Sequence, residues 1–170
     1  MSDLPRNARR VITGFNASGR SAIIADGPSP TTVELSALTS VEAWRVDETP
    51  ADLSLPDTVT GPVSLNPPRM GAIVRVVHFY PDSAADGDVQ VGTEAFGDDE
   101  GGDMHTTDSV DVGVVVSGEI WAVMEDGETL LKPGDVLVQR GTPHKWENRS
   151  DAVCTTFFVL VGADPATRPV

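Results

Sequence analysis

The feature that most constrains the fold is a series of short β-branched runs separated by turns in the second half of the chain. The clearest run is VGVVV at residues 112–116, and it is followed by IWAVM at 120–124 and TLL at 129–131. Valine and isoleucine favour extended backbone, and the Ser-Gly, Asp-Gly and Pro-Gly pairs around these runs favour turns. Strands joined by such short turns pair as an antiparallel meander.

Further strands are expected on both sides of this series. Those after it lie at residues 136–138, 144–146 and 152–161, and those before it lie at 11–15, 21–26, 41–46 and 72–80. The first two are separated by a turn that contains Asn and Gly, which predicts an N-terminal hairpin. Because no amphipathic helix longer than about two turns is evident, the sequence predicts an all-β protein.

The net charge of −14 is concentrated in one third of the chain. Residues 76–131 contain 14 acidic residues and no Lys or Arg, whereas the rest of the chain holds 12 acidic and 12 basic residues. Nucleic-acid binding is disfavoured, because phosphate contacts need Lys and Arg.

Within the acidic third, residues 82–103 are rich in Asp and Gly. We expect a solvated loop there, with a specific cation site as the alternative, although the spacing does not fit an EF-hand loop.

The sequence gives no sign of a membrane or secreted protein. No apolar run approaches the roughly 20 residues of a membrane span, and the N-terminal residues lack the apolar segment of a signal peptide. The single cysteine, Cys154, excludes an intramolecular disulfide and lies in a strand pattern, so we expect a buried and unreactive thiol. These features predict a cytoplasmic protein.

Polar residues and two of the three histidines gather at the ends of the strand series. His105, Thr107, Ser109 and Asp111 alternate along one face of an extended segment. His144 opens a later strand, and a meander can fold so that its first and last strands lie side by side. His105, Asp111 and His144 would then converge. The third histidine belongs to neither segment, and we expect it to be a surface or core residue.

These two segments resemble the paired motifs of the cupin superfamily, and in particular those of small single-domain bacterial cupins. The first motif, G-x5-H-x-H-x3,4-E-x6-G, is matched by His105, Asp111 and Gly118. Thr107 stands in the place of the second His, and Asp111 replaces the longer Glu. The second motif, G-x5-P-x-G-x2-H-x3-N, is matched by Gly134, Gly141, His144 and Asn148, with Gln139 in place of the proline and one residue early.

The resemblance implies a double-stranded β-helix, the jelly-roll β-barrel of the cupin fold, with the N-terminal hairpin as an extension. We expect N-terminal strands and a proline-rich arm at 1–70, the cupin barrel at 71–163 and a tail at 164–170, together forming one structural domain. The arm has five prolines between residues 49 and 69, which interrupt a regular ladder. It is expected to be either a lid over a site or a surface wrap.

The resemblance also implies one divalent metal ion, either iron, manganese, nickel or zinc, held by His105, Asp111 and His144. Because Asp is shorter than Glu by one methylene, Asp111 has general base as an alternative role. Thr107, Gln139 and Trp146 are expected to line a substrate pocket, and Trp146 shares the strand face of His144. The alternative for the whole set is a degenerate site with no metal.

Three functions are compatible with these residues. The first is a metal-dependent enzyme acting on a small organic substrate, for example by dioxygenase-like, decarboxylase or isomerase chemistry. The second is a non-catalytic module that binds a small molecule, and the third is a structural protein with a vestigial pocket. The motif residues favour the enzyme, with the binding module as the alternative. The family resemblance and the N-terminal hairpin together predict a homodimer.

Overall fold

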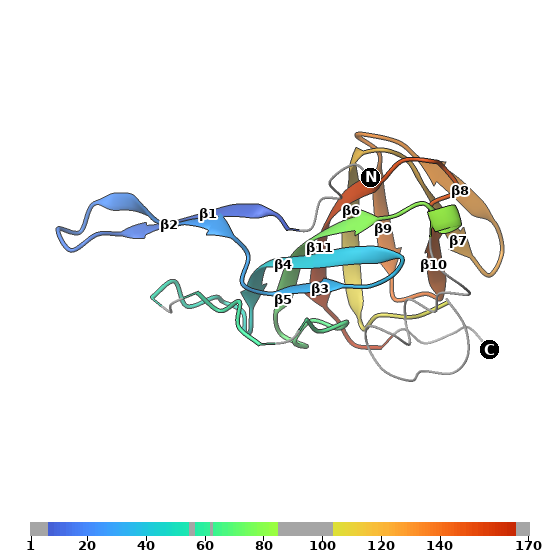
Figure 1. Ribbon diagram of the computed structural model, residues 1–170. Helices are drawn as coiled ribbons and strands as arrows, with labels where there is room; N and C mark the ends of the chain where they lie inside the picture. Colours follow the sequence, from blue (N-terminus) through green and yellow to red (C-terminus); the bar gives the residue numbers. More distant parts are fainter. Residues whose placement is uncertain (1–6, 55–56, 62, 85–103, 166–170) are drawn as a thin grey trace.

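Two facing β-sheets form the body of the protein. The computed structural model describes residues 7–54, 57–61, 63–84 and 104–165. The larger sheet has six strands in the order β3-β4-β5-β11-β6-β9 (Figure 1). Its strands are β3 (Thr32–Glu34), β4 (Leu38–Val46), β5 (Ala72–Phe79), β6 (Ser109–Ser117), β9 (Val136–Arg140) and β11 (Cys154–Gly162).

The smaller sheet contains β7 (Ile120–Met124), β8 (Glu128–Leu131) and β10 (His144–Glu147) in the order β10-β7-β8. All strand pairs in both sheets are antiparallel, as the short turns predicted. β6 and β7 are consecutive in the chain but lie in different sheets, so the turn between them crosses from one layer to the other. The predicted all-β jelly-roll architecture is confirmed.

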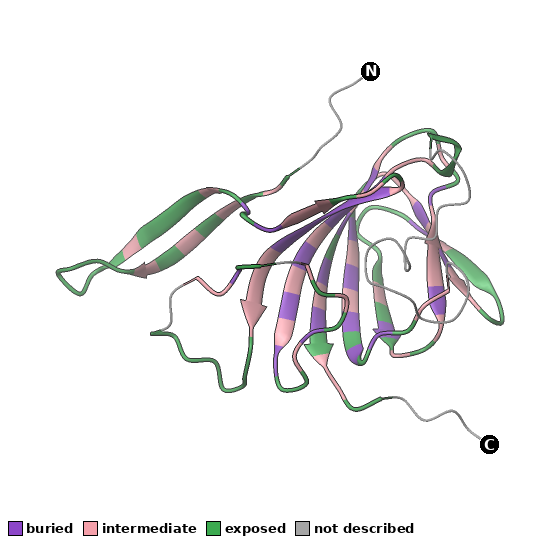
Figure 2. Ribbon diagram, turned by 60° about the horizontal axis from the view of Figure 1, so that its bottom comes forward, coloured by how far each residue is buried: buried purple, intermediate pink, exposed green. Residues whose placement is uncertain are grey.

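A core of apolar side chains fills the space between the two sheets. Its buried members come from β4, β5, β6, β7, β8 and β11 (Figure 2). They are Leu38, Val77, Phe79, Val115, Ile120, Ala122, Leu131, Cys154, Phe158 and Leu160. Cys154 is fully buried, and burial raises the pKa of its thiol to about 11, which agrees with the expected unreactive cysteine.

The N-terminal hairpin projects away from this body (Figure 1). Its strands β1 (Arg9–Phe15) and β2 (Ser21–Pro28) form a two-stranded sheet of their own. β3 and β4 behave differently, because they join the large sheet alongside β5. The sheet of the barrel therefore includes strands that precede the predicted boundary at residue 71. β4 forms backbone hydrogen bonds with β5 and contributes to the hydrophobic core.

The helical content of the described residues is a single 3-10 turn, η1 (Asp82–Ala84). In this part of the chain no helix has the length and apolar character that crossing a membrane requires. The acidic stretch at 82–103, for which a loop or a cation site was expected, lies outside the described residues from position 85 onward.

The turn between β6 and β7 explains the motif glycine at position 118. Gly118 has a φ of 76°, and a Cβ there would lie 2.6 Å from the Val153 carbonyl oxygen and 2.8 Å from the Cys154 Cα. Gly127, in the next turn, also has a positive φ, of 102°, but a Cβ there would meet nothing within 4 Å. Gly118 therefore satisfies two constraints and Gly127 only one.

We predict that Gly118→Ala destabilises the protein much more than Gly127→Ala. Both substitutions place a side chain at positive φ, which costs about 1–2 kcal/mol. Only Gly118→Ala also brings a Cβ against the backbone of Val153 and Cys154, which must then move. The free energy of unfolding, measured in urea, should fall by about 1 kcal/mol for Gly127→Ala and by at least about 2 kcal/mol more for Gly118→Ala. Equal losses in the two variants would contradict this account of the turn.

Candidate functional site

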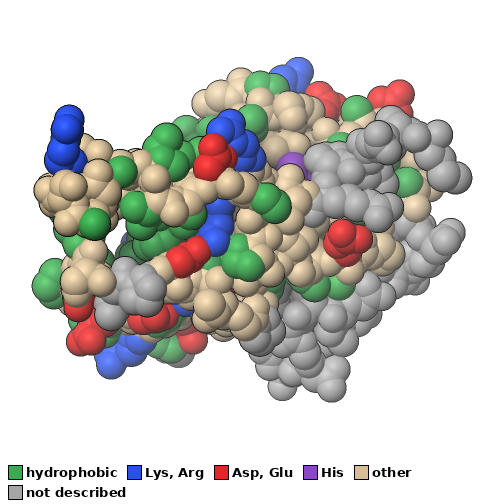
Figure 3. Space-filling view, turned by 60° about the vertical axis from the view of Figure 1, so that its left-hand side comes forward, with side chains coloured by type: hydrophobic (Ala, Val, Ile, Leu, Met, Phe, Trp, Pro, Cys, Tyr) green, Lys and Arg blue, Asp and Glu red, His purple; other side chains and the backbone are tan. Residues whose placement is uncertain are grey.

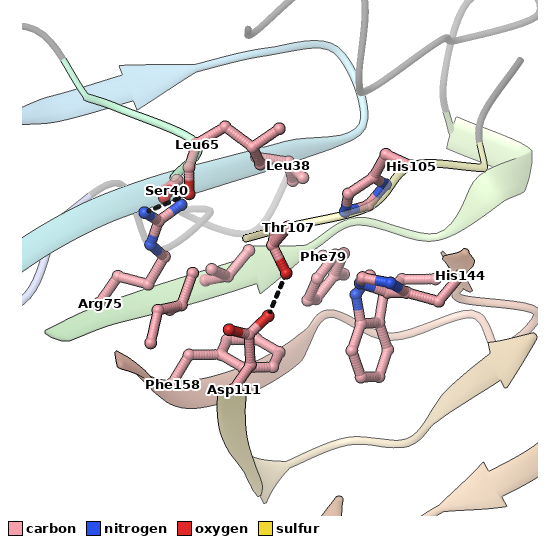
Figure 4. Close-up of a pocket in the computed structure, with 13 residues that line it drawn as sticks. Leu38, Ser40, Leu65, Arg75, Phe79, His105, Thr107, Asp111, His144 and Phe158 are labelled. Carbon is pink, nitrogen blue, oxygen red and sulfur yellow. Dashed lines mark hydrogen bonds between the residues drawn. The ribbon is translucent and has the colours of Figure 1, made fainter. Parts of the chain in front are cut away.

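A cavity opens between the two sheets near the ends of β4, β5 and β6. Its volume is about 80 Å3. The lining combines apolar side chains with a few polar ones (Figure 4). The apolar members are Leu38, Leu65, Val77, Phe79, Trp146, Phe158 and Leu160, and the polar members are Ser40, Arg75, His105, Thr107, Asp111 and His144. Mostly apolar walls with a few polar groups are typical of a small-molecule site.

His105 and His144 form one wall of the cavity and are joined through their backbones. The His105 amide donates to the His144 carbonyl at 2.9 Å, and the His144 amide donates to the His105 carbonyl at 3.0 Å. This isolated antiparallel bridge places the two ring centroids 4.4 Å apart. The predicted meeting of the two histidines at the ends of the series is therefore found.

The ring of His144 is held in one orientation. Its Nδ1 lies 2.9 Å from the Thr142 carbonyl oxygen, so Nδ1 carries the proton and Nε2 presents its lone pair. Burial, and to a lesser degree the charge of His105, lowers the pKa of His144 to about 4. His144 is consequently neutral near pH 7, which is the form that binds a metal ion or accepts a proton.

Asp111 lines the same cavity but has partners of its own. Thr107 Oγ1 donates to Asp111 Oδ2 at 3.0 Å (Figure 4). The Ser109 hydroxyl donates to Asp111 Oδ1. All three side chains are buried, as the expected common face requires. Burial raises the pKa of Asp111, whereas the two hydroxyl groups and the charges of Arg75 and His105 act in the opposite direction.

The segment around Asp111 differs in one respect from the prediction. The strand starts at Ser109 rather than at His105, because the backbone of His105 bonds to His144 instead of continuing the ladder of β6. Thr107 lies between the bridge and the strand, in a short connection that still points its side chain inward.

The donor set fits a divalent metal ion in part. Two imidazoles side by side, of which His144 is neutral and presents Nε2, suit such an ion. Among the described residues no group of three or more His, Cys, Asp or Glu side chains is placed to hold a metal. The predicted ligands His105, Asp111 and His144 all line the one cavity, and their ligand role stays a prediction.

The other predicted pocket residues separate into two groups. Trp146 lines the cavity and packs edge-on against His144 and Phe158, with ring centroids 5.9 and 5.4 Å away. Gln139 is buried but is not among the described residues that line the cavity. Its amide donates to the Thr142 carbonyl at 2.9 Å and its carbonyl oxygen accepts from the Thr142 hydroxyl. Gln139 therefore shapes the turn that supports His144, and its predicted role in the pocket stays a prediction.

Two further residues have structural roles. Asn148 fastens a turn, donating from Nδ2 to the carbonyls of Phe79 and Ala152 at 3.0 and 2.8 Å. His78 is buried on β5, with Nδ1 3.0 Å from Thr155 Oγ1, and does not line the cavity described above. Burial lowers the pKa of His78.

Arg75 and Ser40 line the cavity and were not predicted from the sequence. Arg75 is 5% exposed, and burial lowers its pKa to about 10, which leaves it charged near neutral pH. The available signal was an arginine in the middle of the apolar strand at 72–80, where a charged residue is rarely buried without a purpose. The sequence gave no indication for Ser40, since a serine in a strand is common and points to no particular role.

The proline-rich arm covers one side of the cavity. Leu65 is part of the lining, and Arg75 donates from one terminal nitrogen to the Ser64 carbonyl at 2.6 Å and to the Leu65 carbonyl at 3.3 Å. The side-chain oxygen of Asn66 accepts from the Asp108 amide at 2.9 Å. These bonds attach the arm to β5 and to the segment before β6, so at residues 64–66 it covers the site as well as the surface.

Comparison with known proteins assigns the chain to a family. Residues 93–160 match the model of the cupin domain. Phomopsin biosynthesis cluster protein C' from Diaporthe leptostromiformis is 37% identical over 170 residues, covering 94% of this chain and 81% of that protein. The cupin-domain-containing oxidoreductase srdD from Neurospora crassa is 29% identical over 150 residues, covering 84% of this chain and 67% of that protein. The chain belongs to the cupin superfamily.

Similarity to solved structures is found at low sequence identity. A cupin 2 conserved barrel domain protein from Salinispora arenicola has 16% identity and a TM-score of 0.43, over 74% of this chain and 76% of that one. The relatives from Diaporthe and Neurospora are fungal proteins, whereas the sequence motifs had suggested small bacterial cupins.

We predict that Asp111→Asn stabilises the metal-free protein at neutral pH. A carboxyl whose pKa is raised on folding is penalised once it ionises, so stability is greatest at low pH and is lost as pH rises through the folded-state pKa. The melting temperature of Asp111→Asn relative to wild type should therefore rise by a few degrees at pH 7 and by less at pH 4.

The control for this experiment is Asp126→Asn, at an exposed turn position. It should change the melting temperature little at either pH. A greater stabilisation by Asp111→Asn at pH 4 than at pH 7 would contradict the assigned direction of the pKa shift.

Proposed function

We propose that this protein is a cupin enzyme of the oxidoreductase type, acting on a small organic molecule in a biosynthetic reaction sequence. The observation that carries the proposal is the histidine pair at the wall of a mostly apolar cavity. The names of the relatives support it, because they describe biosynthesis cluster proteins and cupin-domain-containing oxidoreductases. The cavity volume of about 80 Å3 indicates a compact substrate or substrate fragment.

In this proposal His105 and His144 hold one divalent metal ion, either iron, manganese, nickel or zinc. When bound, such an ion supplies open coordination positions that polarise a substrate oxygen or bind dioxygen. Asp111 stays outside this pair and acts as the proton acceptor of the site, with Thr107 and Ser109 fixing its orientation. Trp146 and Phe158 provide an apolar wall that limits water around the bound substrate.

The second candidate is a cupin that binds a small molecule without turning it over and has a degenerate metal site. One observation favours it, namely that the Asp111 carboxylate accepts hydrogen bonds from two hydroxyl groups. In that case the neutral His144 would accept a hydrogen bond from the ligand. The two candidates make different predictions for metal content.

We predict that purified, untagged protein binds about one equivalent of one divalent metal, and that His105→Ala and His144→Ala each reduce this by at least tenfold. The reason is that each variant removes one of two nitrogen donors. The measurement is elemental analysis after reconstitution with each metal in turn, followed by oxygen consumption with candidate substrates.

His78→Ala is the matched control, because His78 is a buried histidine of the same sheet that does not line the cavity. It should retain full metal content. If wild type holds less than about a tenth of an equivalent of every metal tested, the enzyme proposal fails and the binding module remains.

We also propose that the β1–β2 hairpin mediates homodimer formation. The hairpin exposes Val11, Phe15, Ile23 and Ile24, and Phe15 is 79% exposed. Hydrophobic side chains are visible on the side of the molecule toward which the hairpin projects (Figure 3). A two-stranded hairpin is marginally stable by itself, so a second copy of the chain that covers these residues would stabilise it.

We predict that wild type sediments as a dimer at micromolar concentration and that the double variant Phe15→Ser, Ile24→Ser sediments as a monomer. The polar side chains remove the apolar area that association buries. Val136→Ser with Val138→Ser is the control, because both valines are exposed on the edge strand β9. A monomeric wild type, or dissociation in the control alone, would refute the hairpin interface.

A further inference from the structure

Two buried polar atoms in the cavity wall have no partner among the described residues. They are Nε of Arg75 and Oγ of Ser40. Both side chains line the cavity, and both residues are at most 5% exposed. An unpaired buried donor costs free energy unless a ligand or an ordered water satisfies it. Both side chains are hydrogen-bond donors, and the two lie in one wall.

The strand register places these two residues next to each other. β4 and β5 pair with Ser40 opposite Val77 and Glu42 opposite Arg75. Ser40 and Arg75 are therefore diagonal neighbours on one face of the sheet, a separation that a long arginine side chain spans. In Figure 4 both lie at the end of the cavity beneath Leu65, while His105 and His144 lie at the other end.

The nearby carboxylates are engaged elsewhere. Glu42 is paired with Arg45, with 2.9 Å between Oε1 and Nε. The Asp111 oxygens accept from Thr107 and Ser109. Within the described part of the chain, Arg75 itself donates only to neutral carbonyl groups of the proline-rich arm. A buried guanidinium is usually matched by an anion in direct contact, and here that contact is left open.

We propose that Arg75 and Ser40 form a carboxylate-binding subsite, so that the substrate of this cavity is a compact organic acid. The proposal rests on the proposed function, in which the reaction takes place at the histidine pair. One guanidinium N–H and one hydroxyl are suited to the two oxygens of a carboxylate. The apolar walls then hold the body of the acid, with its far end directed toward His105 and His144.

The size and charge of the site are consistent with such a ligand. One water needs roughly 10–15 Å3 on this scale, so a volume of about 80 Å3 accommodates about five to eight small atoms. Arg75 is the one Lys or Arg among the described lining residues. The net charge of −14 acts mostly from the surface, where salt screens it beyond about 8 Å. The buried guanidinium is therefore the one fixed positive charge that the described Lys and Arg residues contribute to the lining.

The test compares 3-methylbutanoate with its neutral isostere 3-methylbutanamide, using the full chain with and without one equivalent of zinc. Dissociation constants come from NMR titration. Wild type should bind the acid at least tenfold more tightly than the amide. Arg75→Gln should abolish this preference, and Ser40→Ala should weaken acid binding about threefold without affecting the amide.

Two controls separate this proposal from the metal proposal. Arg10→Gln removes an arginine that pairs with Asp57 outside the cavity, and it should keep the full preference. His144→Ala should also keep it, because the subsite lies at the opposite end. A preference lost in His144→Ala but retained in Arg75→Gln would place the acid at the histidines and overturn the subsite, while leaving the metal proposal intact.

A measurement on the wild type covers the case in which Arg75→Gln does not fold. The Nε–H resonance of Arg75, assigned through its own side chain, should shift on titration with the acid and not with the amide. No preference for the acid in wild type, or an Nε–H resonance that is unmoved at saturation, would overturn the proposal and leave ordered water as the partner of these two atoms.

Discussion

The two backbone hydrogen bonds between His105 and His144 are the constraint on which the site depends. They close the ends of the strand series against each other and bring the imidazole rings to a centroid separation of 4.4 Å. The bonds use main-chain groups, so the side chains remain available to the cavity. The Thr142 carbonyl then fixes the ring of His144, and Gln139 fixes Thr142. The orientation of the site is thus set by the turn before β10.

The cavity divides its polar groups between two ends, with apolar walls in between. The histidines form one end, Arg75 and Ser40 form the other, and Asp111 lies between them with its own hydroxyl donors (Figure 4). Asp111 differs from the glutamate of the family motif by one methylene, and the partners it has acquired are consistent with a role other than metal ligation. Asp111 and Arg75 have different hydrogen-bond partners, namely two hydroxyl groups for Asp111 and two backbone carbonyls for Arg75.

Much of the fold could be predicted from local patterns. The strand Ile120–Met124 has the predicted bounds, and the N-terminal hairpin, the large apolar strand near the C-terminus and the turn at Gly118 were expected from propensity and glycine placement. Tertiary contacts account for the differences. β6 starts at Ser109 because His105 bonds across to His144, and Gln139 points into a turn because Thr142 supplies a donor and an acceptor within reach.

The all-β architecture follows from β-branched alternation and turn residues, which are local properties of the sequence. The motif residues predict in addition that two histidines and a carboxylate face one cavity, and all three line it. Packing determines how those groups are partnered and which other residues join them. On β5, Val77, His78 and Phe79 are all buried, so alternation separates two faces without identifying the one that meets the cavity. That choice, which places Arg75 inside and His78 outside, depends on packing against β4, β11 and the proline-rich arm.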